Sequence, residues 1–238
     1  ERGLASSRNQ AQRWIAEGKV QSDGGLITKP SLKLAEDASF DIQQDETDRY
    51  VSRGGLKLAA ALEAENIDVS GLAAIDVGAS TGGFTDCLLQ AGVASVVCVD
   101  VGHDQLVEKI KADPRVSNYE GINAKALPKS LLEHSPAGFD LAVMDVSFIS
   151  QTKVLPSLAG FIASGGYLIT LVKPQFEVGK DNIGKGGIVQ SKALYPEVMS
   201  KIEQCLSDLG FKRLRSLDSP IKGGDGNSEF LMVAKKLG

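Results

Sequence analysis

The fold is decided by residues 74–100, which begin Ala-Ile-Asp-Val-Gly-Ala-Ser-Thr-Gly-Gly-Phe-Thr (74–85) and end Ser-Val-Val-Cys-Val-Asp (95–100). Residues 75–77 and 96–99 are short apolar runs, as expected for parallel strands buried on both faces. Between them, apolar residues from Phe84 to Val93 recur at helical spacing. The stretch therefore predicts a strand, a glycine-rich loop, a helix and a second strand, which is half of a nucleotide-binding α/β unit.

The loop does not match the dinucleotide fingerprint Gly-x-Gly-x-x-Gly, because Ser80 takes the place of the second glycine. Asp76, just before the loop, suits a cationic or zwitterionic ligand such as the aminocarboxypropyl arm of S-adenosylmethionine (SAM). Asp100 lies where a ribose hydroxyl pair would be held. A glycine turn without a ligand is the alternative, but the three features occur together. The predicted cofactor-binding residues, with the last at the adenine edge, are Asp76, Gly78, Ser80, Thr81, Gly82, Gly83, Asp100 and Asn123.

Length and composition limit the classes of protein that remain. A chain of 238 residues has room for one α/β domain and a small appendage. Its net charge of −4 gives no overall attraction for nucleic acid, so RNA binding must come from local patches. No apolar run is long enough to span a membrane, and no secretory signal is visible. The three distant cysteines and two histidines form no disulfide or metal pattern. We therefore expect a cytoplasmic protein without a metal.

Residues 1–43 differ from the rest of the chain in charge and pattern. Ser6 and Ser7 are candidate N-caps of a helix that ends at Gly18, and residues 20–25 read as the start of a hairpin. From Arg2 to Lys33 inclusive, the chain has six basic residues and only two acidic ones. The alternative to RNA binding is a basic docking appendage.

Residues 7–20 and the Lys-Pro-Ser run at 29–31 resemble the S4-type RNA-binding domain, a small α+β module. The resemblance implies that this module places a short helix and the adjacent loop against the RNA backbone. Residues 44–52 are polar and charged and read as a linker to the larger domain, residues 53–238. The candidate RNA-binding residues are Arg8, Arg13, Lys19, Lys29 and Arg53.

The remainder of the chain alternates strands and helices, which indicates a mostly parallel sheet. Apolar runs near residues 116–120, 141–145 and 167–172 read as further strands, and a final hairpin-like pair predicts one antiparallel edge strand. Ligands bind such sheets at the carboxyl ends of the strands. Asp145 and Lys173 lie at two of these ends. Read singly, Asp145 could instead cap a helix and Lys173 could be a surface lysine.

Four more residues have a functional interpretation beside a structural one. Lys57 lies in the first turn of a predicted helix, where a cation opposes the helix dipole unless it has another role. Glu229 opens the last predicted strand and could be an ordinary edge carboxylate. Phe148 and Phe176 could stack on a base or pack in the core.

Four motifs together resemble the TlyA family, often labelled hemolysin A, whose catalytic domain is FtsJ-like. They are residues 51–57 (Val-Ser-Arg-Gly-Gly-Leu-Lys), 76–85, 144–150 (Met-Asp-Val-Ser-Phe-Ile-Ser) and 172–177 (Val-Lys-Pro-Gln-Phe-Glu). The resemblance implies a Rossmann-like SAM-dependent methyltransferase that modifies ribose 2′-hydroxyls of ribosomal RNA. It also implies a catalytic tetrad, carried here by Lys57, Asp145, Lys173 and Glu229.

The chemistry of the tetrad fits this reaction. A ribose 2′-hydroxyl is a weak acid, so its proton must leave as the oxygen attacks the methyl group. A lysine can accept that proton only as the neutral amine, which burial or a neighbouring cation favours. We therefore predict that Lys173 is the proton acceptor and that the other three residues orient it.

Two other classes of function stay open at this point. A non-catalytic RNA-binding protein would not need an intact glycine loop and a full tetrad. A membrane-lytic protein is disfavoured by the lack of a spanning or strongly amphipathic basic segment. Among methyltransferases, a base-nitrogen enzyme would carry Asn-Pro-Pro-Tyr or Asp-Pro-Pro-Tyr where this chain has Asp-Val-Ser-Phe at 145–148.

Overall fold

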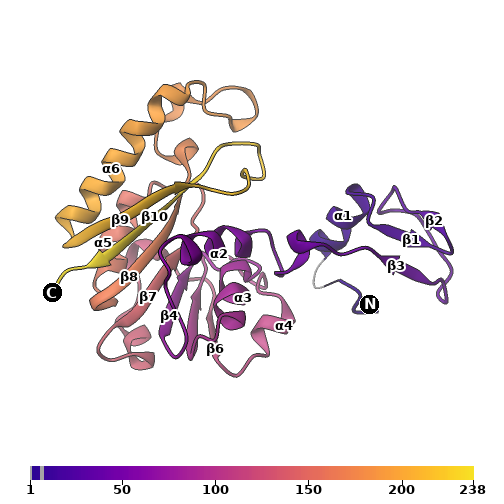
Figure 1. Cartoon of the computed structure of the whole chain (residues 1–238), viewed down its shortest axis with the longest axis horizontal. Coiled ribbons are helices and arrows are strands. Elements are labelled where there is room, and N and C mark those ends of the chain that lie inside the picture. The colour runs from indigo at the N-terminus through magenta and orange to yellow at the C-terminus, as the bar shows by residue number, and fades with distance from the viewer. Residues whose placement is uncertain (1, 6–7) are drawn as a thin grey trace.

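The computed structural model describes residues 2–5 and 8–238, which form a small N-terminal part and a larger α/β part (Figure 1). The small part has one helix and a three-stranded antiparallel sheet of order β2-β1-β3. Its core consists of the buried side chains of Trp14, Val20 and Ile27. The predicted N-caps Ser6 and Ser7 lie outside the described residues. The elements are α1 (Arg8–Ala16), β1 (Val20–Ser22), β2 (Gly25–Leu26) and β3 (Phe40–Ile42).

The predicted helix and hairpin of the small part are both present. The third strand, β3, pairs with β1 through Val20 and Ile42 and was not predicted. Its three residues are too few to give a periodic pattern, and its partner lies 20 residues earlier in the chain. The strand β3 can therefore be recognised only from its pairing with β1 in the folded structure.

The larger part is built on a seven-stranded sheet of order β6-β5-β4-β7-β8-β10-β9. The strands β4 to β8 are parallel to one another, as predicted from the alternation of strands and helices. The strand bounds are β4 (Ala73–Val77), β5 (Ser95–Val99), β6 (Val116–Tyr119), β7 (Phe139–Met144), β8 (Ile162–Val172), β9 (Phe211–Asp218) and β10 (Phe230–Lys236).

The antiparallel strand is internal, which corrects the prediction of an antiparallel edge strand. β10 lies between β8 and β9 and is antiparallel to both. Its residues Leu231–Ala234 are completely buried, as expected for a strand covered on both faces. The edge is taken by β9, whose residues 212–215 are exposed and mostly basic. Charged side chains on an edge strand discourage pairing with other chains.

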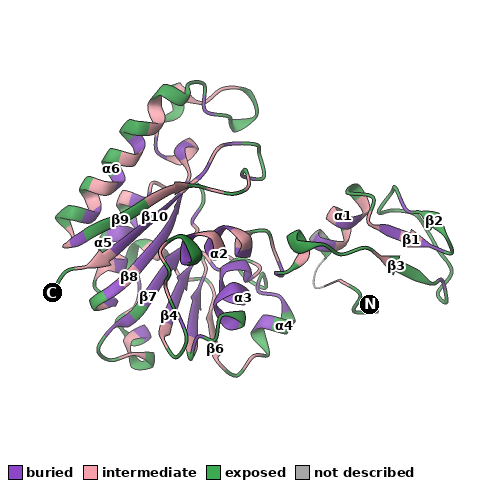
Figure 2. Ribbon diagram, in the orientation of Figure 1, coloured by how far each residue is buried: buried purple, intermediate pink, exposed green. Residues whose placement is uncertain are grey.

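Helices cover both faces of the sheet, and its central strands are largely buried (Figure 2). The two faces carry separate apolar clusters. On β4, Ala74 contributes to the cluster under α2 and α3, whereas Ile75 and Val77 contribute to the cluster under α5 and α6. Each large side chain buried in this way stabilises the fold by about 1.5–3 kcal/mol. The helices are α2 (Gly54–Ala64), α3 (Gly83–Gln90), α4 (Glu108–Lys111), α5 (Leu155–Ala159) and α6 (Tyr195–Asp208).

The remaining helical segments are short 3-10 turns. None of the helices that the structure describes has the length and hydropathy needed to cross a bilayer. The turns are η1 (Glu46–Asp48), η2 (Ala124–Ala126), η3 (Lys129–His134), η4 (Gln151–Lys153), η5 (Pro174–Phe176), η6 (Lys180–Asn182), η7 (Lys185–Gly187) and η8 (Lys192–Leu194).

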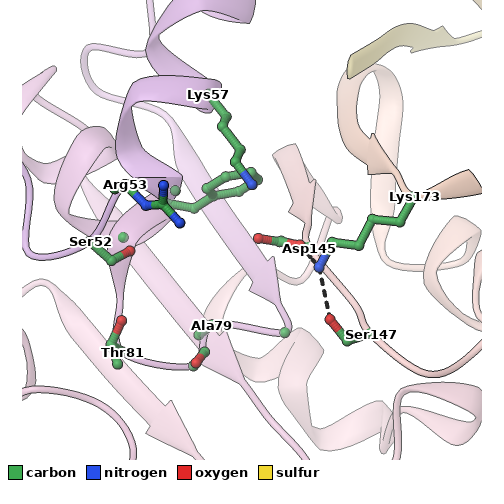
Figure 3. Close-up of a pocket in the computed structure, with 13 residues that line it drawn as sticks. Ser52, Arg53, Lys57, Ala79, Thr81, Asp145, Ser147 and Lys173 are labelled. Atoms are coloured by element: carbon green, nitrogen blue, oxygen red, sulfur yellow. Dashed lines mark hydrogen bonds and ion pairs between the residues drawn. The ribbon is translucent and has the colours of Figure 1, made fainter. Parts of the chain in front are cut away.

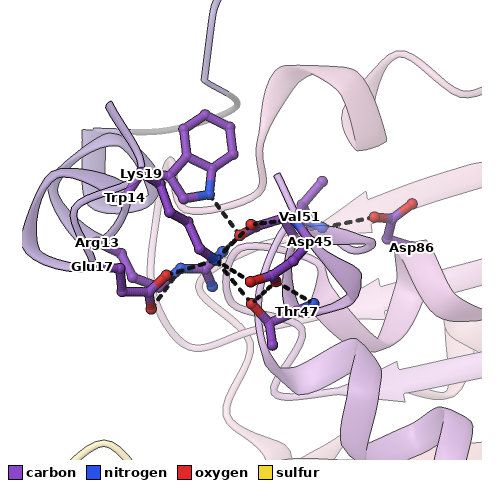
Figure 4. Close-up of polar contacts among 9 residues, drawn as sticks. Arg13, Trp14, Glu17, Lys19, Asp45, Thr47, Val51 and Asp86 are labelled. Atoms are coloured by element: carbon purple, nitrogen blue, oxygen red, sulfur yellow. Dashed lines mark hydrogen bonds and ion pairs between the residues drawn. The ribbon is translucent and has the colours of Figure 1, made fainter. Parts of the chain in front are cut away.

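The segment predicted to be a linker is folded against both parts (Figure 4). The side chain of Asp48, at the end of η1, is only 1% exposed. It accepts hydrogen bonds from Trp14 Nε1 at 2.6 Å and Lys19 Nζ at 2.8 Å, and it forms an ion pair with Arg13. Three residues later, the backbone N–H of Val51 donates to Asp86 on α3 at 2.8 Å. The connection is therefore fixed at both ends by buried carboxylates.

Tyr50 and Val51, which the sequence places in the linker, are buried in the core of the larger part. Gly55 packs so closely on Tyr50 that a Cβ atom there would lie 2.3 Å from the ring. The packed domain therefore begins at about residue 50, before the predicted boundary at residue 53.

Candidate active site

The glycine loop after β4 lies against the end of β7. Gly78 has φ +86°, and a Cβ atom at this position would lie 2.5 Å from the carbonyl oxygen of Asp145. Only glycine allows both this conformation and this approach. Gly82, with φ +95°, turns the chain into α3 as its N-cap. The loop and the Asp145 strand end are thus held in contact by backbone alone.

Asp100, at the end of β5, fixes the middle of the same loop. Its Oδ2 accepts a hydrogen bond from Ser80 N at 2.8 Å, and its Oδ1 accepts one from Gly102 N at 2.7 Å. A carboxylate oxygen has lone pairs for more than one donor. Asp100 can therefore hold the loop and still accept bonds from a ligand.

Two adjoining hollows open at this edge of the sheet and share Gly78, Ser80, Asp145 and Ser147. The first, of about 300 Å³, lies between the glycine loop and α2 (Figure 3). The second, of about 830 Å³, extends past the ends of β5 and β7. Ser80, Thr81 and Gly83 line the first hollow, whereas Asp100 and Asn123 line the second.

Asp76 and Gly82 line neither hollow. Asp76 is fully buried beneath the loop, where its Oδ2 accepts a hydrogen bond from Thr85 Oγ1 at 2.6 Å. Burial raises the pKa of this carboxyl group to about 7. In this structure Asp76 supports the first turn of α3 and Gly82 forms the turn into it, and their contact with a cofactor stays a prediction. The sequence places both residues near the ligand but does not show which way a side chain points.

The four tetrad residues form two lysine–carboxylate pairs. Lys57 Nζ, from α2, lies 2.5 Å from Glu229 Oε2, just before β10. Lys173 Nζ, at the end of β8, lies 2.6 Å from Asp145 Oδ1, at the end of β7. The side chains of both lysines are about nine-tenths buried, at 10% and 12% exposed. Both lysines line the first hollow, whereas Glu229 lies behind Lys57.

Ser147 is a residue of the site that was not predicted from the sequence. Its Oγ accepts a hydrogen bond from Lys173 Nζ at 2.8 Å, so the ammonium group lies between Ser147 and Asp145 (Figure 3). The signal was its position in the Asp-Val-Ser-Phe motif, two residues after Asp145. A hydroxyl group can accept from an ammonium group and donate to a neutral amine.

Phe148 is an exposed aromatic residue in a strained conformation. It is 91% exposed and has φ +63°, which costs a bulky residue about 1–3 kcal/mol. Its ring contacts that of Phe176 at 5.2 Å between centroids, and both residues line the second hollow. The exposure excludes the core-packing interpretation for Phe148.

The predicted RNA-binding residues fall into two groups. Arg8, Lys29 and Arg53 are exposed. Arg13 and Lys19 are instead bound to carboxylates of their own chain, chiefly Asp48. Although burial lowers the pKa of Lys19, its bonds to Asp48 and two further carboxylates raise it above the usual value. Within residues 2–5 and 8–238 no cluster of three or more acidic, histidine or cysteine side chains could hold a metal ion.

The sheet order, the internal antiparallel strand and the site at the carboxyl edge define a Rossmann-like methyltransferase. A SAM-dependent methyltransferase from Listeria monocytogenes shares this fold with a TM-score of 0.57 over 78% of this chain and 99% of that one, at only 14% identity. The chain belongs to the FtsJ-like methyltransferase family, whose model matches residues 50–236. A model of the S4 domain matches residues 1–38.

Two relatives cover almost the whole chain. The 16S/23S rRNA (cytidine-2′-O)-methyltransferase TlyA of Mycobacterium tuberculosis is 41% identical over 97% of this chain and 85% of its own length. A solved structure from Streptococcus thermophilus, described as a candidate hemolysin, is 40% identical. It superposes with a TM-score of 0.80 over 99% of this chain and 85% of that one. The resemblance to the TlyA family and to an FtsJ-like domain is therefore confirmed.

Proposed function

We propose that this protein transfers a methyl group from SAM to a ribose 2′-hydroxyl of ribosomal RNA. The observation that carries the proposal is the arrangement of Lys57 and Lys173. Each is paired with a carboxylate, and both line one hollow beside the glycine loop. The relative from Mycobacterium tuberculosis is named as a cytidine 2′-O-methyltransferase. Such a site suits that reaction.

We infer that the glycine loop holds SAM. Ser80, Thr81 and Gly83 of this loop line the first hollow, and Asp100, which holds Ser80 N, lines the adjoining one. Ser80, Thr81 and Gly83 would surround the methionine part, Asp100 would accept bonds from the ribose hydroxyls, and Asn123 would lie at the adenine edge. When bound, SAM supplies an electrophilic methyl group on a sulfonium cation.

Lys173 would accept the proton of the 2′-hydroxyl as the oxygen attacks. Asp145 and Ser147 hold its Nζ from two directions, and this fixes the amine for proton transfer. A carboxylate neighbour favours the ammonium form, whereas a nearby sulfonium cation favours the neutral amine that can act as a base. Lys57, held by Glu229, would orient the ribose from the opposite wall.

The RNA would be held by exposed cations and an exposed ring. Arg8, Lys29 and Arg53 can neutralise phosphates. Phe148 can stack on the base of the modified nucleotide, which would compensate for its backbone strain. Such a substrate places the protein with ribosomes, in the cytoplasm.

The direct test is incubation with labelled SAM and separated, unmethylated ribosomal subunits, followed by digestion to nucleosides. We expect label in one 2′-O-methylated nucleoside from one or both subunits. Label in a base-methylated nucleoside would contradict the proposal, and so would transfer by Lys173→Ala at the wild-type rate. Lys212→Ala, on the exposed edge strand β9, is the matched control and should be fully active.

A further inference from the structure

Two loops face each other at the carboxyl edge of the sheet and are joined by three side-chain contacts. We call residues 145–151 the β7 loop and residues 173–177 the β8 loop. Lys173 and the Phe148–Phe176 pair make the two contacts that border the hollows. The third contact is made by Glu177, which lines neither hollow and has no part in the proposed chemistry.

The carboxylate of Glu177 is buried and receives three hydrogen bonds. Its Oε1 accepts from the backbone N–H of Gln151 at 2.7 Å. Its Oε2 accepts from Ser150 Oγ at 2.7 Å and from Lys201 Nζ, on α6, at 3.0 Å. The Glu177 side chain is 1% exposed, whereas that of Lys201 is 45% exposed. Two of the three donors therefore belong to the β7 loop, and only the third belongs to a solvated ion pair.

Gln151 extends this contact to the strand that carries Lys173. Its side chain is buried, with Nε2 donating to the carbonyl oxygen of Leu171 at 2.6 Å and Oε1 accepting from Thr170 Oγ1 at 2.9 Å. Both partners lie near the carboxyl end of β8, two and three residues before Lys173. The β7 loop is thus bound both to the β8 loop and to β8 itself.

We propose that Glu177 is a positioning residue that fixes the β7 loop against the β8 loop and so sets Lys173 Nζ in register with Asp145 and Ser147. A buried carboxylate is costly and is retained only where its hydrogen bonds satisfy it. Here those bonds join the two loops that hold the base and its partners. The inference rests on the proposed function, in which Lys173 accepts the proton.

Two substitutions at Glu177 separate positioning from charge. Glu177→Asp keeps the charge, but its shorter side chain cannot reach both Gln151 N and Ser150 Oγ. Glu177→Gln loses the charge but keeps the reach, because its amide can accept from Gln151 and donate to Ser150. A shift of about 1 Å in a catalytic group costs about 100-fold in rate. We expect kcat to fall about 10- to 100-fold in Glu177→Asp and to stay within about fivefold in Glu177→Gln.

The measurement is methyl transfer to ribosomal subunits by the full chain, with kcat and KM for SAM determined separately. Affinity for S-adenosylhomocysteine and the thermal midpoint are measured beside it. KM for SAM and the affinity should change much less than kcat in both variants, because the glycine loop and Asp100 are not part of this contact. Glu203→Gln, which opens the exposed ion pair between Glu203 on α6 and Arg213 on β9, is the matched control and should leave kcat unchanged.

A double variant completes the test. In a Lys173→Ala background, Glu177→Asp should cause no further loss, because no base remains to be positioned. Wild-type kcat in Glu177→Asp, or an equal loss in Glu177→Gln, would overturn the positioning role while leaving the proposed function intact. Normal activity in Lys173→Ala alone would overturn both.

Discussion

The small N-terminal part and the catalytic edge both use buried carboxylates to hold basic side chains, but with different results. In the small part, Asp48 comes from the connecting segment and gathers Trp14, Arg13 and Lys19 around one side chain. At the catalytic edge, Glu229 and Asp145 hold one lysine each, beside a hollow. We propose that the same ion-pair chemistry is structural around Asp48 and serves catalysis at the pairs beside the hollow.

The difference follows from the size of the two cores. Among the described residues, the core of the small part consists of three large buried apolar side chains, those of Trp14, Val20 and Ile27. A core of that size contributes little stability, so a polar cluster must hold the module together. The larger part has two extensive apolar clusters, one on each face of its sheet. Those clusters can support lysines and carboxylates that are committed to function.

The sharpest test of the catalytic half of this comparison is Lys173→Ala. We expect single-turnover methyl transfer to fall by about 100- to 10,000-fold, the usual contribution of a general base. Affinity for S-adenosylhomocysteine should persist, because Lys173 holds no part of the glycine loop. Near-normal single-turnover transfer by Lys173→Ala would show that Lys173 is not the proton acceptor and that the tetrad only positions the ribose hydroxyl.

The structural half is tested by Asp48→Ala. Removing this buried carboxylate leaves Trp14 Nε1 without its acceptor and takes one ion-pair partner from each of Arg13 and Lys19, so we expect the small part to lose about 3 kcal/mol of stability. Trp14 is the only tryptophan in the chain, so its fluorescence reports on this part alone. Its transition should shift to lower denaturant concentration while S-adenosylhomocysteine still binds. Asp45→Ala, at an exposed partner of Lys19, is the control and should have a much smaller effect.

Asp76 sharpens the comparison because it is a buried carboxyl group with no cation partner among the described residues. Burial raises its pKa to about 7, so the folded state binds its proton more tightly than the unfolded state. The stability this provides is complete below about pH 4 and is lost as the pH rises to about 7, by at most about 4 kcal/mol. Asp76→Asn should flatten this part of the stability profile, measured by denaturant unfolding at several pH values. An unchanged profile would contradict the raised pKa.

The carboxylate of Asp100 accepts hydrogen bonds from two backbone N–H groups, and we propose that it also binds the cofactor. Asp100→Ala should weaken S-adenosylhomocysteine binding about 10-fold in calorimetry, because it removes a charged acceptor from the ribose and releases Ser80 N. Asp113→Ala, whose carboxylate pairs with Arg115 away from both hollows, is the control. Tighter binding of NAD than of S-adenosylhomocysteine would refute the assignment of the loop.

The smallest effect is expected for the exposed cations of the small part. Arg8→Gln and Lys29→Gln should each weaken RNA binding modestly and reduce the slope of log affinity against log salt by about one unit. Arg13→Gln should instead destabilise the module, since Arg13 is already paired with Asp48. A salt slope that falls equally in all three variants would show that Asp48 releases Arg13 when RNA binds.

Much of the site was predictable because it follows strand ends. Asp100, Asp145 and Lys173 each end a buried apolar run, and the ends of parallel strands meet at one edge. Glu229 was harder to place, because it precedes a strand. It reaches the same edge because β10 is antiparallel, so that Phe230 pairs with Val172 at the end of β8. Local sequence does not encode the direction in which a final strand enters a sheet.

The sequence by itself determined the alternation of strands and helices, the non-dinucleotide loop at 78–83 and the motifs that bear the tetrad. These features depend on local periodicity and on residue types that can be read in order. Only the tertiary structure decided that Lys57 pairs with Glu229 across 172 residues, that Arg13 and Lys19 face Asp48, and that Asp76 is buried beneath its loop. Pairing and burial depend on which side chains meet in space, and that is fixed by packing and not by neighbours along the chain.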